Sequence, residues 1–342
     1  MVSLGCTLPQ FLREQSQEGE GELAALLTQI ATASQIVSRE MRRSKPAKLS
    51  GLTGEVNVQG EAVTKLDHFA NSVFVQAITE SRLVCHIASE EMEEVVRVTG
   101  DCSSRKYSVL LDPLDGSSNA DINGVVGTIF SIHRHREGMG HETSREAEIL
   151  KRGSDQVAAG YVMYGPGTVL VYSAGKGVNG FTLHPEVNEF IFSHQNVRMP
   201  DRGTTYAINH GNRIHWSSST EKLVEHFSQK DESTRRPYSQ RWVGSLTADF
   251  HRILLEGGLY LYPKDHKRPD GKLRLLYECA PLAFIARQAG GRATTGMEDI
   301  LDIEPTQLHQ RVPLIIGSRE DVDTAERFYQ DEVVGKEKSK EK

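Results

Sequence analysis

Acidic residues gather at three places in the chain, and their types suit a divalent-cation site. Each place directly follows an apolar run, and the residues are Glu90 with Glu91, Asp112 with Asp115, and Glu278. Ligands of α/β proteins gather beyond the carboxyl ends of strands, so loops that leave neighbouring strands can bring such side chains together. Carboxylates that meet repel one another unless a cation lies between them, and hard oxygen ligands suit Mg²⁺ or Mn²⁺.

The string Asp-Pro-Leu-Asp-Gly-Ser-Ser at 112–118 adds donors for a phosphate to this acidic set. Pro113 stiffens the turn because its φ is fixed, and Gly116 lets the backbone approach a ligand closely. Ser117 and Ser118 offer hydroxyl groups and backbone amides. This order of groups suits metal-assisted hydrolysis of a phosphate ester, in which metals polarise the phosphoryl oxygens, lower the pKa of a water and stabilise the leaving alkoxide.

Each of these pieces alone has a plainer explanation. Asp, Gly and Ser are favoured in turns on local grounds, and a Glu-Glu pair is usually solvated surface. A calcium loop of the EF-hand type is disfavoured, because the acids do not alternate along the string and no Glu closes such a loop. The joint pattern of all three clusters is what favours a metal site.

Composition limits the classes of protein that the chain can belong to. The 342 residues correspond to about two domains at roughly 100–200 residues each. A net charge of −6 gives no electrostatic reason to bind nucleic acid or an anionic membrane, and neither partner is expected. The N-terminus lacks the pattern of a signal peptide and no apolar run approaches the roughly 18 residues of a membrane span, so we expect a cytoplasmic protein.

The four cysteines give no motif of their own. Cys6, Cys85, Cys102 and Cys279 form no Cys-x-x-Cys pair and no Cys/His cluster with the spacing of a zinc site. We therefore expect a reducing compartment in which each thiol is a small buried hydrophobe. Cys279, beside Glu278, could be a nucleophile, but a buried thiol is the better interpretation because no base is near it in the sequence.

Hydrophobic periodicity locates the elements that must position these residues. Helical spacing predicts helices near 23–41, 67–78, 219–230, 245–256 and 280–289. Apolar runs predict strands at 84–88, 107–111, 127–133, 157–164, 168–173, 180–183 and 258–262. Loops are predicted at 51–60 and over the charged residues 134–156. The fold class expected is therefore α/β, as a layered α+β arrangement.

Six segments of the sequence resemble the class I fructose-1,6-bisphosphatase family. They are Asp-Pro-Leu-Asp-Gly-Ser-Ser-Asn at 112–119, Val-Gly-Thr-Ile-Phe at 126–130, and the segments at 243–251, 257–263, 271–279 and 308–311. The resemblance runs in order from about residue 8 to residue 331. It implies a sugar-phosphatase fold with alternating layers of helices and sheets, and hydrolysis of the 1-phosphate of D-fructose 1,6-bisphosphate to fructose 6-phosphate and phosphate.

The resemblance also implies two domains and an assembly. The polar segment 194–204 is the expected boundary, between an N-terminal allosteric-type domain at 1–197 that carries the carboxylates and a C-terminal sugar-phosphate-binding domain at 198–333. The residues from Lys336 onward are all charged or hydroxylic, so we expect a disordered tail at 334–342. In the family the arginine that matches Arg241 reaches in from a neighbouring subunit, which implies a homotetramer.

Roles follow from the resemblance for each matching residue. Two or three Mg²⁺ ions per subunit, or Mn²⁺, would be ligated by Glu90, Asp112, Asp115, Glu278 and the backbone oxygen of Leu114. Water would be activated with the help of the acidic pair Glu91 and Asp67. The 1-phosphate would be held by Gly116 and Ser117, with Ser118 beside them. The 6-phosphate and the sugar would be bound by Asn209, Arg241, Trp242, Tyr262 and Lys272.

Several positions depart from the family pattern. Glu61 stands where an aspartate near the metals is common, and is a further candidate ligand. Trp242 replaces a usual tyrosine and so removes a phenolic donor, Asn212 replaces a tyrosine of some members, and Ala280 stands where asparagine is usual. These changes leave open sedoheptulose 1,7-bisphosphate as an alternative or second substrate. An inositol-phosphate or nucleotide phosphatase would use the same metal core, and a non-catalytic protein could use it to sense metal or sugar phosphate.

Two kinds of regulation known in the family are not expected. Lys106, Tyr107 and Arg134 match residues of the family's nucleotide-effector site, with a helix N-terminus at 19–24 for the phosphate. Glu20 and Ala24 stand where threonines are usual, and an acidic Glu20 beside a phosphate predicts weak or absent inhibition by AMP. The segment 134–156 contains no cysteine, so thiol-redox control through it is not expected either.

Overall fold

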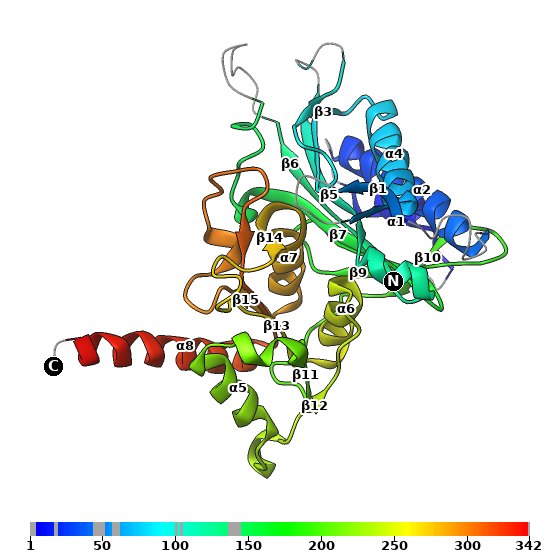
Figure 1. Cartoon of the computed structure of the whole chain (residues 1–342). Helices are drawn as coiled ribbons and strands as arrows, with labels where there is room; N and C mark the ends of the chain where they lie inside the picture. Colours follow the sequence, from blue (N-terminus) through cyan, green and yellow to red (C-terminus); the bar gives the residue numbers. More distant parts are fainter. Residues whose placement is uncertain are drawn as a thin grey trace.

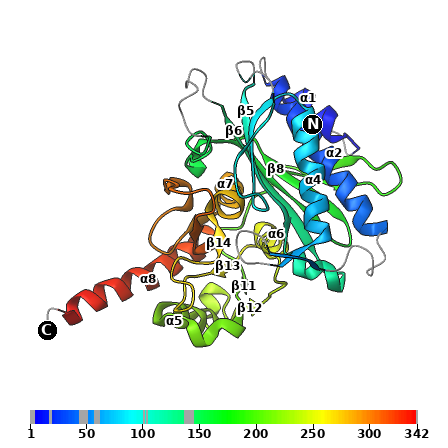
Figure 2. The same cartoon turned by 45° about the horizontal axis from the view of Figure 1, so that its top comes forward.

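The chain folds into alternating layers of helices and sheets (Figure 1). The computed structural model describes residues 5–16, 20–43, 52–56, 62–99, 102, 105–135 and 145–340. Helices α1, α2 and α4 cover one face of an eight-stranded sheet, and α6 and α7 lie between that sheet and a five-stranded one. Helices α5 and α8 pack together beyond the second sheet, and the end of α8 projects away from the rest of the chain (Figure 2).

The first layer contains the helices α1 (Leu8–Gln15), α2 (Gly21–Arg43) and α4 (Lys65–Glu80). The predicted helices near 23–41 and 67–78 are confirmed, whereas α1 was not predicted. Strand β1 (Leu52–Val56) pairs with β2 (Ala62–Thr64), so the loop predicted at 51–60 is wrong for residues 52–56. Helix α4 starts with a capping box in which Thr64 and Asp67 accept from each other's backbone N–H groups.

The eight-stranded sheet has the order β10-β9-β8-β7-β6-β5-β3-β4. Its strands are β3 (Val84–Ser89), β4 (Val96–Arg97), β5 (Tyr107–Asp115), β6 (Val126–Arg134), β7 (Gln156–Tyr164), β8 (Thr168–Ser173), β9 (Asn179–Leu183) and β10 (Phe190–His194). Every residue of β3 and β5 is buried, because helices cover both faces of the sheet there. Such strands have nearly continuous apolar sequences, which is why they could be predicted.

Strands β3 and β5 are parallel, and this pairing brings two acidic clusters together. Their carboxyl ends meet at one edge of the sheet, and the backbone N–H of Glu90 donates to the carbonyl of Leu111 at 3.0 Å. Strand β5 continues through Asp112 to Asp115, opposite Ile129 and Gly127 of β6. The prediction that a turn begins at Asp112 is therefore wrong, because the ladder with β6 extends the strand.

The second sheet has the order β12-β11-β13-β17-β15. Its strands are β11 (Thr205–Ala207), β12 (Ser239–Gln240), β13 (Leu259–Tyr262), β15 (Arg292–Thr294) and β17 (Leu314–Gly317). A separate pair is formed by β14 (Leu273–Arg274) and β16 (Arg311–Val312). The helices around these strands are α5 (Ser218–Ser228), α6 (Leu246–Glu256), α7 (Ala280–Ala289) and α8 (Arg319–Lys340).

Helix α6 packs closely against β6 of the first sheet. A Cβ atom at Gly127 would lie 2.4 Å from Oγ1 of Thr247, so only glycine fits at this crossing. The contact places the N-terminus of α6 beside the carboxyl end of β5. Gly127 in the string Val-Gly-Thr at 126–128 is therefore required by the packing of α6 on β6.

Helix α8 continues through residues 334–340. One further expectation is corrected by the structure. The segment predicted as an exposed loop at 134–156 contains Ile149, Lys151 and Gly153, which are buried against the rest of the fold. Among the described residues, no helix is both long and apolar enough to span a bilayer.

The cysteines also differ from the prediction. Cys85 on β3 and Cys102 form a disulfide, whereas Cys6 and Cys279 are free and buried. The antiparallel pairing of β4 with β3 turns the chain back alongside β3, which brings residue 102 to residue 85. The expectation of four free thiols is therefore wrong for this pair.

Candidate active site

A cleft of about 700 Å³ opens where the carboxyl ends of β3 and β5 meet the starts of α6 and α7. It is lined by fourteen of the residues predicted from the sequence, namely Asp67, Glu90, Glu91, Asp112, Leu114, Asp115, Gly116, Ser117, Ser118, Asn209, Trp242, Tyr262, Lys272 and Glu278. Arg241 is not among the described residues that line it. Glu61 lies outside the described residues.

Three carboxylates form the centre of the cleft. Asp112, Asp115 and Glu278 are buried, and each offers an oxygen within 4.8 Å of the other two. Burial raises the pKa of Asp112 well above its ordinary value, and the charges of Glu90, Asp115 and Glu278 raise it further. Burial likewise raises the pKa of Glu278, to about 8. The protein alone therefore leaves this set short of positive charge, which is the condition that a divalent cation relieves.

Asp115 also accepts hydrogen bonds from the N-terminus of α6. Its Oδ2 accepts from Ser245 Oγ at 2.7 Å and from the Thr247 N–H at 2.8 Å, and its Oδ1 accepts from the Leu246 N–H at 3.2 Å. The N-terminus of α6 supplies these donors because its first backbone N–H groups have no partner within the helix. These contacts fix the carboxylate in one orientation without a metal.

Glu278 reaches the cleft from a π-helical turn (Leu275–Cys279) rather than from the end of a strand. The apolar run that precedes Glu278 is therefore helical, and the residue does join the cluster. Its Oε2 accepts from the Arg274 N–H at 2.6 Å, which holds the carboxylate over the start of α7. Wide turns of this kind are rare and are frequently found at functional sites.

Arg274 is the central residue that the sequence analysis missed. Its Nη2 lies 2.6 Å from Glu90 Oε1, its Nη1 lies 3.8 Å from Glu278 Oε2, and its side chain is 4% exposed. The guanidinium is thus a buried counter-charge within the acidic cluster. The spacing of Lys272 and Arg274 just before Glu278 was the available signal, because it puts two cations near the third acid.

Asp67 and Ser117 meet in the lining of the cleft. Burial raises the pKa of Asp67, while hydrogen bonds from Thr64 and from the Ser117 side chain lower it in part. Gly116 precedes Ser117 in the left-handed region, with φ 72°, and a Cβ there would lie 2.8 Å from the Cβ of Ser245. Glycine is therefore required for the turn that presents the amides beside the carboxylates.

Aromatic and basic residues form the other end of the cleft. Lys272 Nζ lies 5.8 Å from the ring centre of Tyr262, whose hydroxyl accepts from Arg268 at 3.2 Å. Trp242 stacks on Tyr260 with ring centres 5.9 Å apart. The exposed Arg241 instead donates to the carbonyl of Gln240 at 2.8 Å.

A second pocket, of about 350 Å³, lies between α1, α2 and the far ends of β5 and β6. Tyr107 and Arg134 line it together with Glu20 and Ala24, as the predicted effector site requires, whereas Lys106 instead pairs with Glu22 at 2.9 Å. Glu20 pairs with Lys176 at 3.0 Å across this pocket. The acid that was expected to oppose a phosphate does face the pocket.

Comparisons with known proteins agree over almost the whole chain. Residues 6–195 match the family described as "Fructose-1-6-bisphosphatase, N-terminal domain", and residues 199–330 match "Fructose-1-6-bisphosphatase, C-terminal domain". The "Fructose-1,6-bisphosphatase class 1" of Chlorobium chlorochromatii is 49% identical over 95% of this chain and 98% of its own. That of Maridesulfovibrio salexigens is 46% identical over 91% of this chain and 93% of its own.

A solved structure shows the same fold. The crystal structure of Leishmania major fructose-1,6-bisphosphatase in holo form is 36% identical, covers 96% of this chain and 100% of its own, and has a TM-score of 0.89. The fold and the carboxylate-lined cleft thus define a phosphoric monoester hydrolase of the metal-dependent kind. More particularly, the chain belongs to the fructose-1,6-bisphosphatase family, class 1.

Proposed function

We propose that this cleft hydrolyses the 1-phosphate of D-fructose 1,6-bisphosphate to give fructose 6-phosphate and inorganic phosphate. One observation carries the proposal: the buried cluster of Asp112, Asp115 and Glu278 adjoins the Gly116–Ser117 turn, and basic residues line the same cleft beyond it. A bisphosphate has two anionic ends. The cleft offers one set of groups for each.

The donor set fits Mg²⁺, because it consists of oxygen ligands and because the pKa values of Asp112 and Glu278 are raised in the absence of a cation. Two or three ions per subunit would be held by Glu90, Asp112, Asp115, Glu278 and the carbonyl of Leu114. When bound, such ions polarise the phosphoryl group, lower the pKa of water and neutralise the leaving oxygen. Mn²⁺ suits the same ligands.

The chain's own residues bind and orient the substrate around that centre. The amides of Gly116 and Ser117, with Ser118, hold the 1-phosphate, and Asp67 and Glu91 accept the proton of the attacking water. The raised pKa of Asp67 brings this acid closer to the range in which it can exchange a proton near neutral pH. The 6-phosphate and the sugar contact Asn209, Trp242, Tyr262 and Lys272.

The test is the release of inorganic phosphate in the presence of Mg²⁺, with fructose 1,6-bisphosphate and sedoheptulose 1,7-bisphosphate assayed under one set of conditions. We expect fast turnover of the fructose ester and slower turnover of the sedoheptulose ester, because Trp242 fills space beside the sugar. No release from either ester would refute the proposal. Comparable release from both would make the enzyme a dual-substrate phosphatase.

We also propose a homotetramer in which Arg241 completes the cleft of a neighbouring subunit. The side chain is exposed and lines no part of the cleft of its own chain, although it adjoins Trp242, which does. The proposed units are an N-terminal domain at 1–197 and a C-terminal domain at 198–333, in a cytoplasmic enzyme. Replacing Arg241 by Ala should raise the KM for the bisphosphate while kcat changes less, and the same effect on a monomeric protein would contradict the proposal.

A further inference from the structure

A four-residue segment, 241–244, connects β12 to the start of α6 beside the cleft. Trp242, Val243 and Gly244 line the cleft, and Arg241 directly precedes them. All four residues are described by the structure, belong to no helix or strand, and are exposed or half-buried. The conformation of the segment therefore has to be fixed by contacts other than a regular backbone ladder.

Asp249 holds this segment by its backbone. It lies one turn inside α6, four positions after the N-cap Ser245, and is 2% exposed. Its Oδ1 and Oδ2 accept from the Val243 N–H at 3.0 and 3.2 Å, and Oδ2 also accepts from the Gly244 N–H at 3.1 Å. Asp249 is not among the described residues that line the cleft. The carboxylate thus fixes two consecutive amides beside the cleft without bordering the cleft itself.

The charge of Asp249 suits these two donors. Burial raises its pKa to about 6, although the N–H groups of Val243 and Gly244 lower it in part. The carboxylate is therefore ionised near neutral pH, and an ionised carboxylate only accepts hydrogen bonds. An amide of the same shape would turn an NH₂ group towards one of the donors.

Two further contacts anchor the segment. The Arg241 N–H donates to the carbonyl of Tyr206 at 2.8 Å, and Asn119 Nδ2 donates to the carbonyl of Val243 at 3.4 Å. Asn119 belongs to the helical turn that follows Gly116 and carries the amides proposed for the 1-phosphate. The segment is thus held between β11, α6 and that turn, with the ring of Trp242 stacked on β13.

Two carboxylates share the run of residues from 243 to 247. Asp249 accepts from residues 243 and 244, whereas Asp115 accepts from the next three, Ser245 to Thr247. Asp115 belongs to the proposed metal centre, and the residues that Asp249 holds adjoin Trp242 at the sugar end. Loss of the first set of bonds should therefore weaken substrate binding, and loss of the second should slow the chemical step.

We propose that Asp249 is a positioning residue for the sugar and the 6-phosphate of the substrate. Its carboxylate fixes the amides of Val243 and Gly244 and so keeps Trp242 at the cleft and Arg241 in place for a neighbouring subunit. This inference rests on the proposed function, which assigns Trp242 and Arg241 to that end of the substrate.

Asp249→Asn tests the inference, because the amide keeps the shape of the side chain and sets an NH₂ group against an N–H donor. Phosphate release from fructose 1,6-bisphosphate is measured at saturating Mg²⁺, and binding of the product fructose 6-phosphate is measured by titration calorimetry. We expect the KM for the bisphosphate and the Kd for fructose 6-phosphate to rise at least about tenfold, with kcat lowered less than about threefold.

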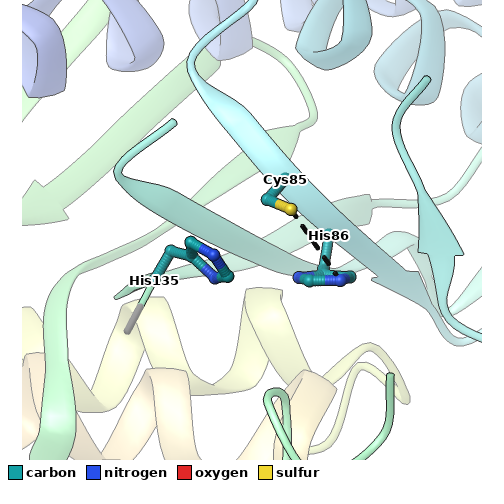
Figure 3. Close-up of side chains that lie close together, drawn as sticks. All are labelled: Cys85, His86 and His135. Carbon is teal, nitrogen blue, oxygen red and sulfur yellow. Dashed lines mark hydrogen bonds between the residues drawn. The ribbon is translucent and has the colours of Figure 1, made fainter. Parts of the chain in front are cut away.

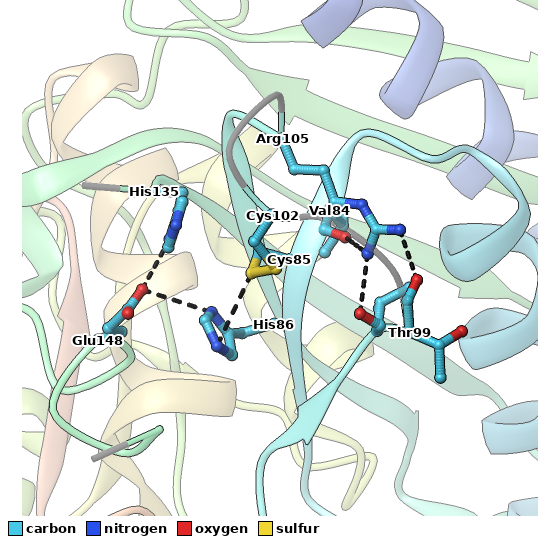
Figure 4. Close-up of a disulfide and its surroundings, with 9 residues drawn as sticks. Val84, Cys85, His86, Thr99, Cys102, Arg105, His135 and Glu148 are labelled. Carbon is cyan, nitrogen blue, oxygen red and sulfur yellow. Dashed lines mark hydrogen bonds and ion pairs between the residues drawn. A yellow bond between two sulfur atoms is a disulfide. The ribbon is translucent and has the colours of Figure 1, made fainter. Parts of the chain in front are cut away.

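Glu148→Gln is the matched control, because it makes the same change from carboxylate to amide away from the cleft. Glu148 Oε2 lies 2.7 Å from His135 Nδ1 and 3.5 Å from His86 Nδ1, and the side chain is 11% exposed (Figure 4). His86 comes from β3 and His135 directly follows β6 (Figure 3). None of these three residues is among those that line the cleft. Any fall in Tm in this control should leave KM and Kd unchanged.

Gly244→Ala acts on the same segment while Asp249 stays intact. Gly244 has a φ of +85°, which alanine adopts only with strain. A Cβ there would lie 3.6 Å from Trp242 Nε1, which is an ordinary contact, so the strain acts on the backbone. This variant should also raise the KM for the bisphosphate while kcat changes less.

Three results would overturn the inference. The first is an unchanged KM and Kd in Asp249→Asn, with circular dichroism showing an intact fold. The second is a fall in kcat alone, which would place the effect at Asp115 and the proposed metal centre. The third is an unchanged KM in Gly244→Ala. Absence of phosphate release by the wild type would instead refute the proposed function, on which the inference rests.

Discussion

Replacement of Arg274 by Met tests whether the carboxylate cluster depends on a positive charge that the protein itself provides. The guanidinium is buried, with Nη2 at 2.6 Å from Glu90 and Nη1 at 3.8 Å from Glu278. Methionine keeps much of the aliphatic stem and removes the charge. Removing one partner of a buried ion pair costs about 3–5 kcal/mol, because the remaining charges stay buried without it.

The cost should depend on pH in a defined direction. Burial raises the pKa of Glu278 to about 8 even with Arg274 present, and Arg274 lowers that pKa. When folding raises the pKa of an acid, the folded state binds its proton more tightly than the unfolded state does. The free energy of unfolding therefore falls as the pH rises from the pKa of the unfolded state to that of the folded state. Without Arg274 this fall is larger, so the metal-free variant should fall further below the metal-free wild type at about pH 8 than at about pH 6.

Thermal unfolding with chelator measures the difference. At about 2 °C per kcal/mol for a chain of this size, we expect a Tm lower by roughly 6–10 °C at the higher pH, and a smaller gap in excess Mg²⁺ because the ion replaces the lost charge. Arg252→Met is the control, since its pair with Glu256 is exposed and should contribute about 0–1 kcal/mol with no dependence on Mg²⁺. A gap for Arg274→Met that ignores both pH and Mg²⁺ would refute the reasoning.

Three further predictions concern the two pockets. Asp115→Asn should lower kcat by at least about 10²-fold while circular dichroism shows an intact fold, since the amide keeps the shape but loses the charge; full activity would contradict the metal assignment. Addition of Mg²⁺ should raise the Tm of the metal-free wild type more at about pH 8 than at about pH 6, because Glu278 must lose a proton to bind the ion. An equal rise at both pH values would contradict the release of a proton from Glu278. Micromolar AMP should leave the steady-state rate unchanged, because Glu20 faces the second pocket; inhibition would show that Lys176 neutralises this acid.

The sequence predicted which residues would lie together in the cleft where strands and local turns position them. Strands β3 and β5 are continuous apolar runs, so the convergence of Glu90 with Asp112 follows from parallel pairing alone. Gly116 was predicted to be needed because it lets the backbone approach a ligand closely. The structure gives two stronger reasons for glycine here, namely a left-handed φ of 72° and the lack of space for a Cβ beside Ser245.

Contacts between distant segments could not be predicted in this way. Arg274 forms an ion pair with Glu90, which lies 184 positions earlier in the sequence. Hydrophobic periodicity reports only on neighbouring residues, so it could not predict this contact. The disulfide of Cys85 with Cys102 and the contact of His86 with Glu148 depend on how β3, β4 and β6 align in the sheet. Propensity also failed at β1, where pairing with β2 makes a strand of a polar, glycine-containing segment.

The hydrogen bonds between Asp115 and the start of α6 join two separately built parts of the protein. Asp115 ends a strand of the eight-stranded sheet, whereas Ser245 and Thr247 belong to the half of the chain that builds the five-stranded sheet. This carboxylate therefore joins the two halves of the chain, in addition to its proposed role as a metal ligand. Any rotation of one half against the other must displace it, so the geometry of the proposed metal centre depends on the relative orientation of the two sheets.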